Sequence, residues 1–270
     1  MWTTRDAIIY PISLAIMLCI AVGCYFIFRG KCNKYKIIPF QIVAGLFLGL
    51  EIAKQLVGLI AFDEYRMFWL PLHICSGIIL FLPFAVFLKQ KWNITKVFWD
   101  LSFVVALMGS VALLGSPSDT VSQSQSLFID ADFMGYHSFF FHLLMVMTLM
   151  LYLALRPYRP HTKDVFWGGI IFAAYLGFVA IMANVLQSNF AMFLNNNLFN
   201  LNNIRDSHGY YLFQFIQWLI YMVCYTLSGI AILLGTRIYF ALLKRKNRDK
   251  VPMKTNPEGE QKCGVDTMQY

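Results

Sequence analysis

The amino-acid sequence predicts an all-α, polytopic membrane protein with seven transmembrane helices, an outer N-terminus and a cytoplasmic C-terminus. Three observations support this prediction: the composition, the length of the apolar stretches and the placement of the basic residues. Of the 270 residues, 59% are hydrophobic and 13% are charged, whereas soluble proteins have about 45–50% apolar and about 25% charged residues. A chain of this composition divides naturally into bilayer crossings of roughly 20 apolar residues each.

Seven apolar stretches are long enough to cross a bilayer as helices. We place them at about residues 7–29, 37–61, 68–88, 97–115, 133–155, 165–187 and 210–240. The first stretch is interpreted as a membrane helix rather than a signal peptide. Asp6 cancels the charge of Arg5, and the strongest nearby basic cluster follows the stretch instead of preceding it.

The connections between these stretches alternate in charge. In order along the chain they are basic, acidic, basic, acidic, basic and Asn-rich, and a basic tail follows the last stretch. Because cytoplasmic loops of membrane proteins carry an excess of Lys and Arg, this alternation predicts the orientation of every helix. The predicted inner side holds 18 of the 22 basic residues: Arg29, Lys31, Lys34, Lys36, Lys89, Lys91, Lys96, Arg156, Arg159, Lys163, Arg237, Lys244, Arg245, Lys246, Arg248, Lys250, Lys254 and Lys262.

The sequence predicts two parts, a seven-helix transmembrane domain at residues 1–243 and a flexible basic cytoplasmic tail at residues 244–270. The Asn-rich segment 188–209 is expected to form an ordered or re-entrant outer loop. The net charge of +8 arises on the inner side of the membrane, so it does not indicate a nucleic-acid partner. The six cysteines are scattered and show no disulfide framework of the kind found in small secreted domains.

Ionisable side chains within the apolar stretches need an explanation, because each costs about 2.5–3.5 kcal/mol to insert at the centre of a membrane helix. With the predicted orientation, nearly all of them fall in the outer half of the membrane, and Asp100 near the inner end of the fourth stretch is the exception. A single polar layer of this kind predicts a pocket open to the outer side. The layer consists of Glu51, Lys54, His73, Cys75, Ser110, His137, His142, Asn184, Gln187, Gln214 and Gln217.

Several of these residues also have a purely structural interpretation. Glu51 and Lys54 are three residues apart on one helix and can simply pair with each other. Ser110, Gln214 and Gln217 suit hydrogen bonds between helices, and Cys75 suits a small buried position. His137 lies near enough to the interface to face lipid headgroups. His73 and His142 lie deeper, and a histidine at that depth needs a partner or a task.

Three motifs carry a resemblance to a known family. They are Leu70-Pro71-Leu72-His73-Ile74-Cys75-Ser76, Phe139-Phe140-Phe141-His142, and the segment from Asn184 through Asn189 to Leu194. In this order and on these helices they resemble the signatures of the YwaF-like bacterial integral-membrane proteins, over nearly all of residues 1–240. The resemblance implies a multi-pass protein of the cell membrane, in a bacterium its cytoplasmic membrane.

The YwaF-like family is itself distantly similar to eukaryotic multi-span lipid acyltransferases, and more remotely to membrane hydrolases of fatty-acid esters. In the acyltransferases a cysteine directly precedes the third-helix histidine and carries the acyl group, but this chain has Leu72 there. Cys75, two residues after His73, would lie about 200° round a regular helix. The second-helix threonine of the hydrolases also has no counterpart in this chain. The histidine positions of these families are therefore present, but the positions of their nucleophiles are not.

These observations predict a lipid-directed acyltransferase or ester hydrolase that takes a lipid or acyl substrate from the membrane. His142, with His73, would act as general base, and Cys75 or a bound water as nucleophile. Substrate-binding roles are assigned to a further set: Glu51, Lys54, His137, Asn184, Asn189, Gln214 and Gln217. No metal site is expected, because the histidines lack metal-ligand spacing, and no cofactor or oligomeric state is indicated.

The alternative is a small-molecule transporter or a ligand-binding membrane protein, including a receptor, that uses the same Glu, Lys and His cluster. The mostly apolar inner halves and the absence of an internal sequence repeat argue against transport. The seven-helix, N-out arrangement alone is compatible with a sensory receptor.

Overall fold

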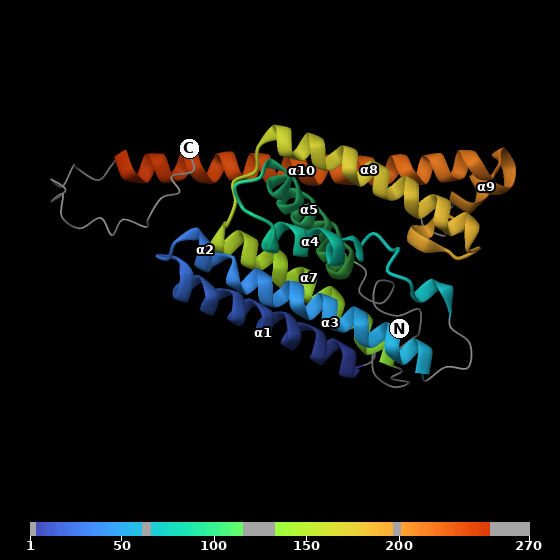
Figure 1. The fold of residues 1–270 in the computed structure, drawn as a ribbon, viewed down its shortest axis with the longest axis horizontal. Coiled ribbons are helices and arrows are strands. Elements are labelled where there is room, and N and C mark those ends of the chain that lie inside the picture. The colour runs from blue at the N-terminus through green and yellow to red at the C-terminus, as the bar shows by residue number, and fades with distance from the viewer. Residues whose placement is uncertain (1–3, 61–65, 116–132, 197–200, 249–270) are drawn as a thin grey trace.

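The computed structural model describes residues 4–60, 66–115, 133–196 and 201–248, and within these ranges it is all-helical, without strands (Figure 1). Most of the long helices run roughly along the long axis of the molecule, and α5 is inclined to it (Figure 1). Their bounds are α1 Thr4–Phe28, α2 Asn33–Lys36, α3 Ile38–Ile60, η1 Met67–Trp69, α4 Gly77–Phe87, α5 Asn93–Gly115, α7 Phe133–Leu155, α8 Thr162–Val185, η2 Phe190–Met192, α9 Leu201–His208 and α10 Tyr210–Arg248.

Six of the described helices are long and apolar enough to cross a membrane: α1, α3, α5, α7, α8 and α10. α4 is also apolar but has 11 residues. Large apolar side chains remain exposed along the outer flanks of the bundle, for example Ile42, Phe166 and Leu227, each about 60% exposed. Such a surface suits contact with lipid chains, so the prediction of an all-α, polytopic membrane protein is confirmed.

The core of the bundle lies around α5, which packs against α4, α7, α8 and α10. Its fully buried side chains include Trp99, which lies edge-on to Phe40 of α3 with 5.1 Å between ring centroids. The Trp99 indole Nε1 donates to Gln90 Oε1 at 3.0 Å, which satisfies its only polar atom. α1 packs mainly on α7, so the N-terminal helix lies at the edge of the bundle (Figure 1).

The third predicted helix is wrong in its first half. Residues 68–88 were expected to be continuous, but η1 ends at Trp69, residues 70–76 are non-helical, and α4 begins only at Gly77. Pro71 accounts for the break, because the residue before a proline is driven away from helical backbone angles, and Leu70 has extended angles, φ −58° and ψ 145°. The depths and the 200° separation expected for His73 and Cys75 on a regular helix therefore do not apply.

The last helix extends past the predicted division between the transmembrane domain and the tail, and that division stays a prediction. α10 continues through Arg248, five residues beyond the expected end of the transmembrane domain at 243, and residues 249–270 lie outside the described part of the chain. The fifth helix matches its predicted bounds of 133–155. The described parts of segment 188–209 are ordered, as η2 and α9.

The described helices place the Asn-rich loop and the basic connections at opposite ends of the bundle (Figure 1). The orientation predicted from the basic residues is testable with a pair of introduced cysteines. We expect Ser207→Cys in α9 to react with a membrane-impermeant maleimide in sealed cells. Lys91→Cys, in the exposed connection before α5, is expected to react only after permeabilisation. Labelling of Lys91→Cys alone in sealed cells would reverse the orientation.

Candidate functional site

Polar side chains of α3 form a compact buried network near the end of that helix. Lys54 Nζ lies 2.8 Å from Glu51 Oε2, and both side chains are only 10% exposed. Gln55 Nε2 donates to Glu51 Oε1 at 2.6 Å and to the Trp69 carbonyl at 3.0 Å. The predicted Glu–Lys pair is therefore formed. Gln55 was not singled out from the sequence, although its i,i+4 spacing from Glu51 was a usable signal.

Lys54 connects this network to two other predicted site residues. Its ammonium group is close enough to interact electrostatically with the Cys75 thiol, from the segment before α4, and with the His137 imidazole of α7. α3 packs against both α4 and α7, which accounts for this convergence. Lys54 is thus within electrostatic range of side chains from two other segments, the one before α4 and α7.

The two histidines of α7 are five residues apart and lie in different environments. His142 Nδ1 lies 2.8 Å from the Ser138 carbonyl oxygen, which only accepts, so Nδ1 carries the hydrogen. In neutral imidazole the lone pair is then on Nε2, the form required of a proton acceptor. His137 is 8% exposed, and its Nε2 has no hydrogen-bond partner among the described residues. The two imidazoles interact electrostatically.

His73 lies on the other side of Cys75, against the loop after α8. The Tyr175 hydroxyl donates to the His73 carbonyl at 2.9 Å, and the imidazole lies edge-on to Phe190, with 5.9 Å between ring centroids. Tyr175 and Tyr221 both lie within electrostatic range of Cys75. Neither tyrosine was singled out from the sequence, because a tyrosine in an apolar helix carries no distinctive local pattern. A common cavity for His73 and His142 remains a prediction.

The amide side chains assigned to substrate binding bond mainly to one another and to the backbone. Asn184 Nδ2 donates to Gln214 Oε1 at 3.2 Å, and Asn196 Nδ2 donates to Gln217 Oε1 at 2.7 Å. Asn189 Oδ1 accepts from the backbone of residues 194 and 195 at 2.9 and 3.1 Å. These bonds tie the loop after α8 to the start of α10, which fits the structural interpretation given for Gln214 and Gln217.

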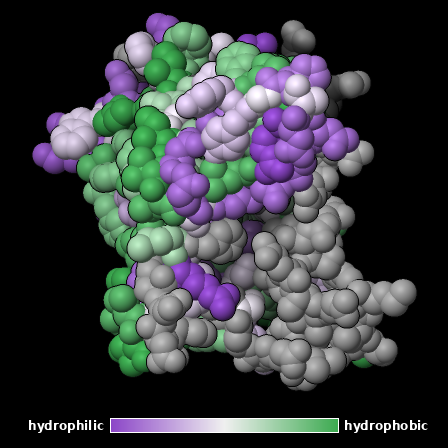
Figure 2. Space-filling view, turned by 90° about the vertical axis from the view of Figure 1, so that its right-hand side faces the viewer, coloured by the Kyte–Doolittle hydropathy of each residue, from purple (hydrophilic) through white to green (hydrophobic). Residues whose placement is uncertain are grey.

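Figure 2 looks onto this end of the molecule. Hydrophilic side chains gather there in its upper part, over α9 and the adjoining loop, while apolar side chains cover the flank beside them. α9 and the adjoining loop thus present a hydrophilic face at one end of the bundle.

A second polar group lies at the opposite end of the bundle, around Asp100. This residue is fully buried, and neither carboxylate oxygen has a hydrogen-bond partner among the described residues. Asp100 and Asp164 are close enough to interact electrostatically, and the Tyr158 hydroxyl donates to Asp164 Oδ2. Burial and these two carboxylates raise the pKa of Tyr158 above its usual range, so this phenol stays a donor.

Within the described ranges, no group of three or more His, Cys, Asp or Glu side chains is arranged to hold a metal ion. Cys75 is one of four described cysteines with free thiols, with Cys19, Cys24 and Cys224, whereas Cys32 is disulfide-bonded. The groups within reach of the Lys54 ammonium are therefore the Glu51 carboxylate, the Cys75 thiol and the His137 imidazole.

Comparison with known proteins gives one family. The sequence profile of the TMEM164 family matches residues 1–236. No curated protein and no solved structure matches the chain. The matched range includes every residue of the polar cluster and all the described helices except the last turns of α10. The narrower resemblance to YwaF-like proteins and a bacterial origin remain predictions.

Proposed function

The chain belongs to the TMEM164 family of membrane proteins, and from this premise we propose that it is a lipid-directed acyltransferase or ester hydrolase. The observation that supports the proposal is that Lys54 lies within electrostatic range of Cys75 and of His137, and His137 within electrostatic range of His142. Acyl transfer needs a nucleophile, a proton acceptor and a positive group near the carbonyl oxygen. The cluster contains a candidate for each.

His142 is assigned the role of proton acceptor. The hydrogen bond from Nδ1 to the Ser138 carbonyl orients the ring and leaves the Nε2 lone pair available. Lys54 is assigned the role of stabilising negative charge. That charge is on the thiolate of Cys75, or on the carbonyl oxygen of the substrate while the nucleophile attacks it. The salt bridge to Glu51 holds the ammonium in place without removing its positive charge from the cluster.

The covalent form of the reaction has two steps. The thiol proton passes to His142 Nε2, the Cys75 sulfur attacks the ester carbonyl, and the ester C–O bond breaks, so the alcohol leaves with that proton. A thioester on Cys75 remains. Water or a second lipid hydroxyl then attacks the thioester, the C–S bond breaks, and the acyl group passes to the acceptor while the thiol is restored. In the alternative without a covalent intermediate, water attacks the ester carbonyl directly, and His142 takes up the proton of that water without help from Cys75.

The test uses the purified full chain with a phospholipid that carries an isotope-labelled acyl chain. We expect release or transfer of the labelled acyl group, and a mass increase of one acyl group on Cys75 in the intact protein. Cys75→Ala should remove this adduct, while the matched control Cys224→Ala should retain it. Acyl turnover without an adduct would assign the nucleophile to water. A protein that neither hydrolyses nor transfers the acyl group would refute the proposal.

A transporter is the second candidate, and the buried carboxyl of Asp100 favours it. Transport needs polar groups along a path to the inner side, and the inner halves of the apolar stretches offer few. Asp100, Asp164 and Tyr158 supply such groups at the opposite end from Lys54. The labelled-lipid experiment separates the two candidates, because a transporter would leave the ester bond intact.

A further inference from the structure

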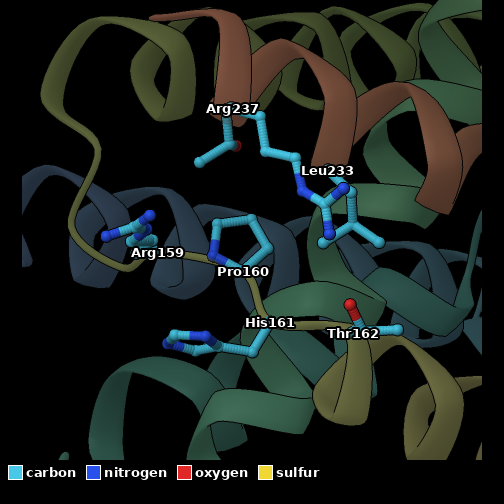
Figure 3. Close-up of a pocket in the computed structure, with 7 residues that line it drawn as sticks. Arg159, Pro160, His161, Thr162, Leu233 and Arg237 are labelled. Atoms are coloured by element: carbon cyan, nitrogen blue, oxygen red, sulfur yellow. The ribbon is translucent and has the colours of Figure 1, made fainter. Parts of the chain in front are cut away.

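A cavity of about 160 Å³ lies away from the Lys54 cluster, where the connection between α7 and α8 meets the last third of α10. Its lining is mostly polar: Arg159, Pro160, His161, Thr162, Leu233, Thr236 and Arg237. In Figure 3, Leu233 and Arg237 of α10 lie across from Pro160 and Thr162. The lining residues carry two guanidinium groups, an imidazole and two hydroxyl groups, and the two guanidinium groups lie on opposite sides of Pro160 (Figure 3).

The charge of this cavity is positive. No acidic side chain is found among its described lining residues. The nearest acid in the sequence, Asp164, is buried and accepts a hydrogen bond from the Tyr158 hydroxyl. Arginine guanidinium groups bind phosphate oxygens through paired hydrogen bonds, and threonine hydroxyls donate to the same oxygens. The lining therefore has the chemistry of a phosphate site.

The start of α8 adds to this character. His161 is the N-cap residue of this 24-residue helix, and its side chain makes no capping hydrogen bond. The N-terminus of a helix carries a partial positive charge and favours anions. Thr162, the first residue of α8, lines the cavity. The backbone thus adds positive potential to a space already bordered by two arginines.

The level of the cavity in the membrane indicates the source of the phosphate. α7 ends at Leu155, α8 begins at Thr162, and the apolar span of α10 ends at Tyr239. The cavity lies where three apolar spans end, which is the level of the lipid headgroups. Basic pockets between transmembrane helices at this level bind anionic headgroups.

We propose that this cavity binds the phosphate group of an anionic phospholipid headgroup. The volume of about 160 Å³ exceeds that of several water molecules, each of roughly 30 Å³ in the liquid, so a phosphate fits with part of its hydration. Leu233 provides an apolar contact beside the two arginines. This site is independent of acyl chemistry near Lys54, because it lies at the other end of α7, α8 and α10.

The test uses the purified full chain in neutral detergent and three probes: dioctanoyl phosphatidylglycerol, dioctanoyl phosphatidylcholine and inorganic phosphate. Binding is measured by native mass spectrometry or titration calorimetry. We expect the anionic lipid to bind at least tenfold more tightly than the neutral one. In the double variant Arg159→Gln/Arg237→Gln, the affinity for the anionic lipid should fall by about 10- to 100-fold.

A matched control removes two positive charges outside the cavity. Lys89→Gln/Lys91→Gln changes two exposed residues before α5 and should alter the affinity less than twofold. Equal binding of inorganic phosphate and the anionic lipid would keep the phosphate site but assign its ligand to free phosphate, which overturns the lipid source. The proposal would be overturned if both double variants lost the same affinity for the anionic lipid. It would also be overturned if the unaltered protein bound the anionic and the neutral lipid with equal affinity. The melting temperature of each double variant is measured as well, because an unchanged value excludes misfolding as the cause of a lower affinity.

Discussion

Replacing His142 with glutamine is expected to remove acyl transfer while leaving the fold intact. A positioned general base typically contributes about 10²–10⁴-fold to the rate, so kcat/KM should fall by a factor in this range. The amide of glutamine is still able to donate a hydrogen bond, as Nδ1 does to the Ser138 carbonyl, but it does not accept a proton at neutral pH. The measurement is turnover of the labelled phospholipid, beside thermal unfolding in detergent.

The matched control for this variant is His208→Gln. His208 is exposed in α9 and its Nδ1 lies 2.6 Å from the neighbouring Ser207 hydroxyl, away from the Lys54 cluster. Its replacement should leave both turnover and melting temperature unchanged. If His142→Gln keeps normal turnover, the imidazole has a structural role only, and the general base of the proposed reaction must be another group.

The lengths of the apolar stretches were sufficient to predict most of the described helices, whereas the orientation inferred from the basic connections stays a prediction. The span 133–155 matches α7 residue for residue, because a membrane imposes a fixed length and an apolar composition on each crossing. The break at residues 70–76 was not predicted, because the whole stretch is apolar and hydropathy carries no information about backbone conformation. Pro71 was the available signal, and its effect on Leu70 outweighed the apolar pattern.

The ionisable residues of the candidate site were easier to predict from the sequence than the roles of its amide side chains. The cost of burying an ionisable group pointed to Glu51, Lys54, His137 and His142, and the structure brings the first three into one electrostatic cluster with Cys75. The amides at 184, 214 and 217 were singled out by their depth, and Asn189 by the motif that carries the family resemblance. Depth does not show which partner a polar group has, and here their partners are mainly each other and the backbone.

Glu51→Ala is expected to destabilise the protein strongly, by about 3–5 kcal/mol, because it leaves the Lys54 ammonium buried without its carboxylate. The salt bridge is short, at 2.8 Å, and both side chains are only 10% exposed. Removing both charges, in Glu51→Ala/Lys54→Ala, should cost less than the single change, since no unpaired charge then remains. The measurement is the free energy of unfolding in detergent for both single variants and the double variant.

An exposed ion pair provides the comparison. Arg205 and Asp206 lie 2.9 Å apart, but their side chains are 31% and 64% exposed, so Asp206→Ala should change the free energy of unfolding by no more than about 1 kcal/mol. If the losses from Glu51→Ala and Lys54→Ala add in the double variant, the two side chains do not interact in the folded protein. Lys54 would then not be held beside Cys75 and His137 by Glu51, and the assignment of Glu51 as the residue that positions the ammonium would fall with it.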